Sequence, residues 1–158
     1  VITYVLTTLA TFGVILLLAR EGFESEEIAD LAGLNQRSPL YAGVMAVCLF
    51  SMAGIPPMVG FYAKLSVLQS LLASGQSLYM ALAVFAVIMS LIGAFYYLRV
   101  VKVMYFDKAT DAEPVTQVGM DMRVLLSVNA IALLVLGIVP DGLYSVCVEA
   151  MKQSLQVL

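Results

Sequence analysis

The chain has 158 residues, 62% of them hydrophobic and 12% charged, with a formal net charge of −3 at pH 7. This composition is typical of an integral membrane protein rather than a soluble domain, and the lack of basic runs argues against nucleic acid as a partner. The chain has no histidine, and its two cysteines form no CxxC pair. Zinc sites and catalytic triads built on histidine are therefore excluded, and we expect no cofactor or metal in the chain itself.

The first apolar run predicts a membrane-spanning helix over about residues 1–20. The run begins without a methionine and lacks the basic start of a signal peptide, so we expect a piece of a longer membrane protein. A polar stretch follows, in which Ser25 is placed to cap a short amphipathic surface helix over about residues 25–34, with Glu26 and Glu27 in its first turn. Such a helix is either solvated or a docking surface for a partner.

The longest apolar segment runs from Tyr41 to Ser74 and contains one charge, Lys64. A continuous helix of this length would measure about 50 Å, whereas the hydrocarbon core of a bilayer is roughly 30 Å thick. We therefore predict a span over about residues 40–74 that is broken near residues 54–58.

Glycine and proline residues stand where this break is expected. Pro56 and Pro57 lack the N–H that would close a helical turn, and Gly54 tolerates the backbone conformations that follow, with Gly60 in the same pattern. Backbone groups freed by a break are costly in lipid but can line a polar cavity. The alternative for these residues is a packed proline kink.

Lys64 lies about 15 Å from the end of the segment at Ser74, counted along a helix, and so near the middle of the bilayer. From that depth a lysine side chain would hardly reach water, and burial favours the neutral amine unless an acidic partner or water compensates. No aspartate or glutamate lies inside the predicted spans. We predict that Lys64 transfers protons; the alternative is a buried lysine that stays charged and is structural.

Two further spans are predicted, over about residues 77–106 and 122–140, separated by a polar loop. Asn129 is the one strongly polar side chain between Val124 and Pro140 and is expected to form an interhelical hydrogen bond. Residues 141–158 form a short tail with some amphipathic character. The predicted fold is all-α, a polytopic membrane helix bundle in a single domain with one discontinuous transmembrane helix.

If each span crosses the membrane once, most basic residues fall on one side, which the positive-inside rule assigns to the cytoplasm or matrix. Both ends of the chain then face outward. The basic residues on the inner side are Arg20, Arg37, Arg99, Lys102, Lys108 and Arg123, against Lys152 on the other.

Two stretches of this sequence resemble one protein family. The first is LFSMAGIPPMVGFYAKL, around the expected break, with the pattern GIPP-x2-GF-x2-K, and the second is IGAFYYLRVVKVMYF, at the end of the next span. Both resemble the C-terminal part of subunit N of proton-pumping NADH:quinone oxidoreductase, respiratory complex I, whose mitochondrial counterpart is NADH dehydrogenase subunit 2. The resemblance runs from about Val1 to the C-terminus and indicates the antiporter-like subunit family.

The resemblance implies a fold of fourteen helices in two inverted repeats, of which the spans here would be the last four. It implies that Lys64 is the terminal proton-loading or release site, and that the family's other functional residues, a glutamate and lysines on earlier helices, lie upstream. The implied function is proton translocation coupled to quinone reduction, within an enzyme whose FMN, iron–sulfur clusters and quinone are bound elsewhere.

The partners implied in this way are the other membrane subunits of complex I, especially neighbouring antiporter-like subunits, and the lipid bilayer. The implied location is the bacterial inner (plasma) membrane rather than the mitochondrial inner membrane.

Related proteins provide alternatives. Subunits of multisubunit cation/proton antiporters and of membrane-bound hydrogenases share the broken helix. Subunit L of complex I tends to carry an acidic residue directly after the lysine, where this chain has Leu65, and subunit M tends to have glutamate in place of the lysine. A structural membrane anchor is an alternative of a different class. Proton exchange at Lys64 would separate the transport functions from the anchor.

Overall fold

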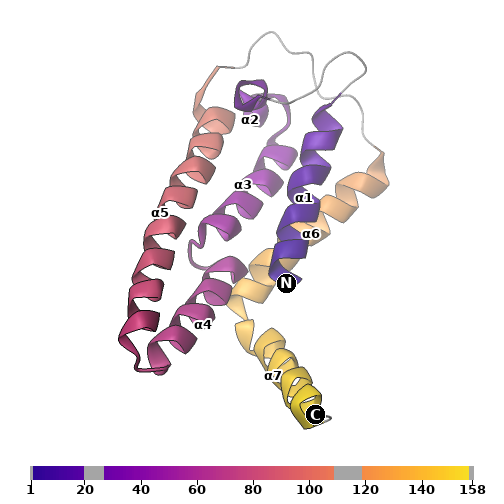
Figure 1. Ribbon diagram of the computed structural model, residues 1–158. Helices are drawn as coiled ribbons and strands as arrows, with labels where there is room; N and C mark the ends of the chain where they lie inside the picture. The colour runs from indigo at the N-terminus through magenta and orange to yellow at the C-terminus, as the bar shows by residue number, and fades with distance from the viewer. Residues whose placement is uncertain (1, 20–26, 109–118, 157–158) are drawn as a thin grey trace.

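The computed structural model describes residues 2–19, 27–108 and 119–156, and every element within these ranges is a helix (Figure 1). Arg20 and Ser25, the expected ends of the first span and start of the surface helix, lie outside them. In chain order the elements are α1 (Ile2–Leu18), the 3-10 helix η1 (Ile28–Leu31), α2 (Leu34–Arg37), α3 (Pro39–Ala53), α4 (Val59–Ala73), α5 (Ser77–Phe106), α6 (Met120–Ile138) and α7 (Pro140–Gln156).

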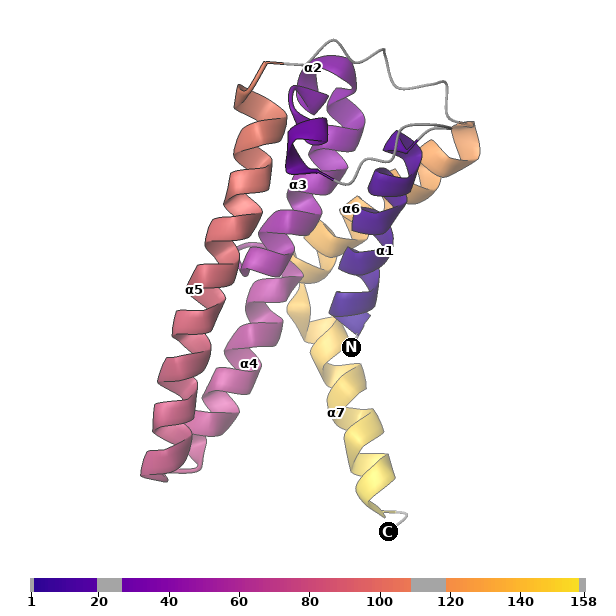
Figure 2. The same cartoon turned by 45° about the horizontal axis from the view of Figure 1, so that its top comes forward.

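Helix α3 forms the centre of the bundle. It lies between α1 and α5 and also packs against α6 (Figure 1, Figure 2). A helix that is apolar on all sides is typical of a protein core or of a membrane span, and α3 buries most of its side chains. The neighbouring helices each bury one stripe at a spacing of three or four residues, namely Thr7, Ala10, Val14 and Leu18 in α1 and Leu126, Ala130, Leu133 and Gly137 in α6.

Helix α5 is the longest element, with 30 residues, or roughly 45 Å at the rise of an α-helix. It runs beside both α3 and α4 (Figure 2) and buries only Ala83 and Met104 among its side chains. By length and composition α5 and α6 are each able to cross a membrane. Helices α3 and α4 have 15 residues each, so only the two together match the length of α5.

The element between Pro39 and Ala73 is interrupted, as predicted. Helix α3 ends in a Schellman motif, because the N–H of Gly54 (φ 82°) bonds the Ser51 carbonyl at 3.1 Å and the N–H of Ile55 bonds the Phe50 carbonyl at 3.1 Å. Helix α4 begins again at Val59.

The four predicted break residues do not all lie in the break. Gly54, Pro56 and Pro57 are in the connection between α3 and α4, and both prolines are exposed. Gly60 is instead buried as the second residue of α4. Gly60 therefore allows the start of α4 to pack closely against α3 and does not interrupt the helix.

The surface helix predicted over about residues 25–34 is corrected by the structure. The described part of this stretch forms two short turns, η1 and α2, separated by Gly33 in the left-handed conformation (φ 64°). Glu27 and Asp30 cap η1 reciprocally, and the Arg37 guanidinium donates to the Asp30 carbonyl at 2.8 Å. A left-handed glycine ends an α-helix, so the amphipathic pattern cannot continue through it.

Residues 140–156 of the expected tail form helix α7, which starts at Pro140, the last residue assigned to the preceding span. Proline is favoured at the first position of a helix, because an N–H at that position would have no acceptor within the helix. Helix α7 projects from the end of α6 away from the rest of the bundle (Figure 1).

The described basic residues lie mainly at one end of the bundle. This end carries α2, the end of α5 and the start of α6, while the α4–α5 turn and α7 lie at the other (Figure 1). Arg37, Lys102, Lys108 and Arg123 are at the first end, and Lys152 belongs to α7. This is the distribution that the topology prediction requires, and which end faces the cytoplasm stays a prediction.

Candidate functional site

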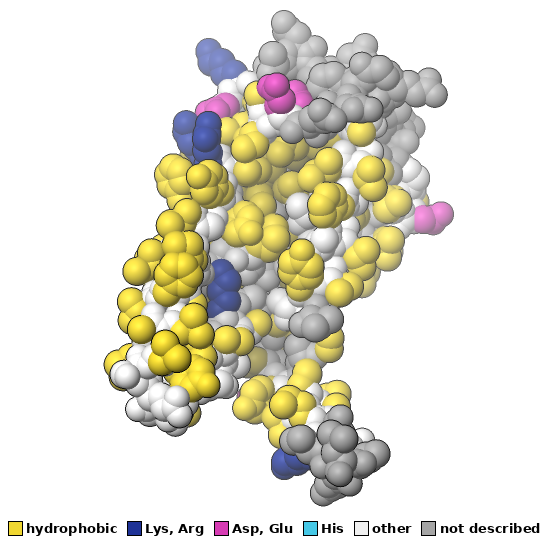
Figure 3. Space-filling model, in the orientation of Figure 1, with side chains coloured by type: hydrophobic (Ala, Val, Ile, Leu, Met, Phe, Trp, Pro, Cys, Tyr) yellow, Lys and Arg dark blue, Asp and Glu magenta, His cyan; other side chains and the backbone are white. Residues whose placement is uncertain are grey.

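The amine of Lys64 joins three helices at the level of the break. Lys64 is in the second turn of α4, and its Nζ donates to the carbonyl oxygen of Ala53 at 3.0 Å and to Oγ of Ser90 at 2.8 Å. Ala53 is the last residue of α3, and Ser90 lies near the middle of α5. Figure 3 shows one basic side chain at mid-height on a face made mostly of hydrophobic side chains.

The break supplies one of these two hydrogen-bond partners. The last carbonyls of an α-helix have no N–H partner within the helix, and they form the negative end of its dipole. A cation placed there gains typically 0.3–1 kcal/mol, and up to about 2 kcal/mol when it is partly buried. The end of α3 therefore stabilises the protonated form of the Lys64 amine.

A groove of about 820 Å³ between α4 and α5 contains this side chain. Its polar lining is made by Lys64 and Ser90 and by the backbone at Ala53 and Gly54, while the remaining lining is apolar. A Cβ atom on Gly54 would lie 3.0 Å from Cδ and 3.3 Å from Nζ of Lys64. The positive φ of 82° favours glycine at this position, and the lysine side chain passes close beside it.

No carboxylate within the described residues forms an ion pair with Lys64. The described ion pair joins Lys102 and Asp107 near the end of α5, at 3.8 Å. The amine is half-buried, and its described hydrogen bonds are to uncharged oxygens. The described residues therefore supply this amine with hydrogen-bond acceptors but with no opposite charge.

Comparison with known proteins decides the family. Residues 1–108 match the family model described as NADH:quinone oxidoreductase/Mrp antiporter, transmembrane. The chain belongs to this family. It is 63% identical over 153 residues to a protein of Polaromonas naphthalenivorans named NADH-quinone oxidoreductase subunit N, an alignment that covers 96% of this chain and 30% of that protein. It is 57% identical to the protein of the same name from Herminiimonas arsenicoxydans over 98% of this chain and 31% of that protein.

The comparisons confirm the resemblance to subunit N and, with the helices described above, the predicted fold class: an all-α membrane bundle of the antiporter-like family with one discontinuous helix. The chain spans about 30% of the length of these relatives.

Three residues that contact Lys64 or the backbone near the break were not identified from the sequence. Ser90 is the one polar side chain between Tyr79 and Tyr96, and this isolation is the signal that could have found it. Ser51 is buried and accepts the N–H of Gly60 at 3.3 Å. Gly137 packs against the break, and nothing in the sequence distinguishes it from other small residues in membrane helices.

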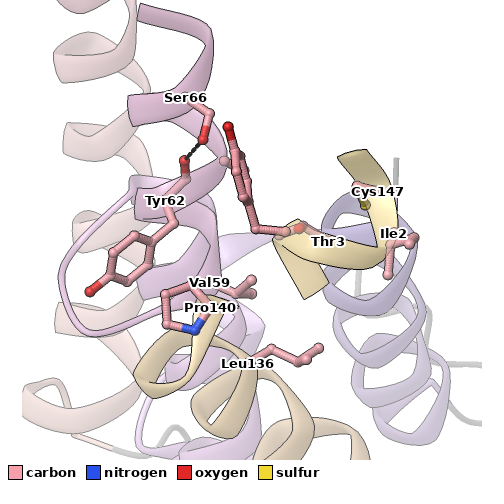
Figure 4. Close-up of a pocket in the computed structure, with 10 residues that line it drawn as sticks. Ile2, Thr3, Val59, Tyr62, Ser66, Leu136, Pro140 and Cys147 are labelled. Atoms are coloured by element: carbon pink, nitrogen blue, oxygen red, sulfur yellow. Dashed lines mark hydrogen bonds between the residues drawn. The ribbon is translucent and has the colours of Figure 1, made fainter. Parts of the chain in front are cut away.

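A second groove of about 360 Å³ lies on another side of α4, where the starts of α1 and α7 and the end of α6 meet. Figure 4 shows Val59 and Pro140 on one side of it and Ile2 and Cys147 on another, with the Ser66 hydroxyl bonded to the Tyr62 carbonyl at 2.8 Å. The residues that line this groove are uncharged. The Lys64 groove is therefore the candidate site.

In the part of the chain that the structure describes, the interhelical hydrogen bond predicted for Asn129 is not seen at its side-chain oxygen. The Oδ1 atom is buried and accepts no hydrogen bond from the described residues.

Proposed function

We propose that this chain is part of a proton-translocating membrane subunit of NADH:quinone oxidoreductase, and that Lys64 takes up and releases a proton during quinone reduction. One observation carries the proposal: a lysine amine at the middle of a broken span is held by uncharged oxygens at the edge of a groove. The names of the bacterial relatives support the same function.

The two hydrogen-bond partners give the amine a defined position in both protonation states. As an ammonium group it donates to Ala53 and Ser90, and the end of α3 stabilises its charge. As a neutral amine it loses that electrostatic stabilisation but also the cost of a charge at mid-bilayer depth. Opposing contributions of this kind are what a lysine that exchanges protons requires.

In this proposal the chain supplies no redox chemistry. FMN, the iron–sulfur clusters and quinone are bound by other parts of the enzyme, and the chain contributes to catalysis as one subunit of the oxidoreductase. Its partners are the other membrane subunits, especially neighbouring antiporter-like subunits, together with the lipid bilayer. Since the relatives are bacterial, the proposed location is the bacterial inner membrane.

The test is quinone-coupled proton pumping in sealed membranes that contain the intact oxidoreductase. Lys64→Met keeps the length of the side chain and removes the titratable amine, so pumping should be impaired while assembly is largely retained. Lys64→Arg should also pump poorly, because a guanidinium group does not release its proton. NADH oxidation with an artificial acceptor should persist in both variants, and it provides the measure of complex content.

The results separate this function from a structural one. If Lys64 were a permanent structural charge or part of a membrane anchor, arginine would restore function and methionine would fail through lost assembly. Normal pumping in both variants would remove Lys64 from the pathway.

A cation/proton antiporter subunit is the second candidate, because the description of the matching family model includes Mrp antiporters. That function predicts cation-driven proton exchange in the absence of NADH and quinone.

A further inference from the structure

We infer that Ser90 is a positioning residue for Lys64, whose hydroxyl reverses its hydrogen bond when the amine changes its protonation state. This inference rests on the proposed function of Lys64. Ser90 approaches the amine from α5, across the groove from the end of α3, with 2.8 Å between Oγ and Nζ.

The two partners of the amine differ in what they can do. The Ala53 carbonyl can only accept a hydrogen bond, whereas the Ser90 hydroxyl can accept or donate. An ammonium group donates to both oxygens. A neutral amine can still donate to Ala53 while its lone pair accepts the Ser90 O–H, which needs only a rotation of the hydroxyl. Ser90 therefore keeps the side chain in place in both states.

Ser90 is free to rotate in this way because it is not bonded to its own helix. Serines in membrane helices commonly donate to the carbonyl four residues earlier. Ser66, Ser70 and Ser127 do so, with distances of 2.8, 2.9 and 2.8 Å. Among the hydrogen bonds of the described residues, the Ser90 hydroxyl takes part only in the bond with Lys64.

The apolar surroundings increase the importance of this contact. The groove around Ser90 is lined by Ala86, Val87 and Ala94 of the same helix, none of which has a polar side chain. A hydrogen bond between partly buried groups is stronger than one in water, and its loss leaves the amine with a single partner that accepts only. Without Ser90 the neutral amine has no described donor for its lone pair.

The test compares initial rates of NADH-driven, quinone-coupled proton uptake by sealed inverted membranes, normalised to complex content by oxidation of NADH with an artificial acceptor. Ser90→Ala should lower this rate by about tenfold or more, as expected for loss of a hydrogen bond to a charged group. Ser70→Ala is the matched control, a serine of α4 that bonds within its own helix, and it should pump at the wild-type rate.

Two further sets of variants distinguish positioning from packing. Ser90→Thr and Ser90→Val have nearly the same shape and differ in the hydroxyl, so threonine should retain pumping and valine should lose it. This pair decides the question even if Ser90→Ala assembles poorly. Lys64→Met and the double variant Lys64→Met/Ser90→Ala should pump equally, because Ser90 acts through Lys64.

The inference would be overturned if Ser90→Ala or Ser90→Val pumped at the wild-type rate. It would also be overturned by an equal loss of pumping in the threonine and valine variants, or by an additional loss in the double variant. The proposed function fails separately. If Lys64→Met pumps normally, Lys64 is not in the pathway, whereas impaired Lys64→Met with normal Ser90→Ala removes only Ser90.

Discussion

Gly137 of α6 lies against the backbone of Pro57, in the break between α3 and α4. A Cβ atom at Gly137 would contact the Pro57 carbonyl oxygen and would come within 2.6 Å of the Val59 nitrogen. Helix α6 therefore supports the interrupted backbone directly, without side chains between them. The broken span is held from two sides, by α6 at the break and by α5 along its length.

We predict that Gly137→Ala separates α6 from the break. Because the nearest atoms are backbone, they cannot move aside as a flexible side chain would, and overpacking of this kind costs about 1–3 kcal/mol or more. The amount of assembled oxidoreductase and its resistance to heat should both fall. Gly43→Ala is the matched control, since a Cβ there meets nothing within 4 Å. If both variants gave the same amount of assembled oxidoreductase and the same heat resistance, the close contact between Gly137 and the break would be contradicted.

A second prediction concerns the crossing of α3 and α4. A Cβ atom at Gly60 would meet the backbone carbonyl of Ser51, so Gly60→Ala should destabilise the bundle and move the start of α4 away from the end of α3. Since that movement displaces the Lys64 amine from the Ala53 carbonyl, the rate of proton pumping should fall by a larger factor than the amount of assembled complex. Gly93→Ala, in α5, meets only an ordinary contact at 3.8 Å and should be neutral. Pumping and complex content measured on the same membranes check this, and a proportional loss of both would show a purely structural effect.

The hydroxyl of Ser51 gives a third prediction. It accepts the N–H of Gly60 in the first turn of α4, where no carbonyl of the same helix is available. Ser51→Ala leaves this buried N–H without its acceptor, which costs about 1–3 kcal/mol. The heat resistance of the purified oxidoreductase should drop measurably, while Ser74→Ala, at an exposed bond beyond the end of α4, should leave it unchanged. A Ser51→Ala enzyme as heat-resistant as the wild type would show that this bond contributes little.

The orientation of the bundle in the membrane is tested by replacing two exposed glutamines, at opposite ends of the bundle, with cysteine and labelling each cysteine. Gln36 lies in α2, and Gln76 lies in the turn between α4 and α5. In a Cys147→Ser background, an impermeant thiol reagent added outside should label Gln76→Cys and spare Gln36→Cys, because basic residues gather at the Gln36 end. Inverted membranes should show the opposite pattern. Labelling of Gln36→Cys from outside intact cells would reverse the topology.

The sequence was sufficient to predict the long helices and the break, for physical reasons that involve only neighbouring residues. An apolar run longer than a bilayer is thick must be interrupted, and Gly54 with Pro56 and Pro57 leaves one place for the interruption. Lys64 stood out because a charge at that depth is costly.

Contacts between helices could not be predicted in the same way. Helix α5 is apolar on all sides, so its sequence does not say which side meets α4, and Ser90 could have faced lipid. In the described part of the predicted surface helix, the amphipathic pattern did not reveal that two short helical turns form, with the left-handed Gly33 between them.

The unbroken helix α5 also sets the depth of the Lys64 amine in the membrane. Ser90 and Arg99 are on the same unbroken helix, nine residues apart, which corresponds to roughly 14 Å. If Arg99 is anchored at the membrane surface, the register of α5 fixes how far below that surface the Lys64 amine is held, whatever the shape of the break. Adding or removing a residue between these two positions would rotate Ser90 by about 100° away from the amine as well as changing its depth.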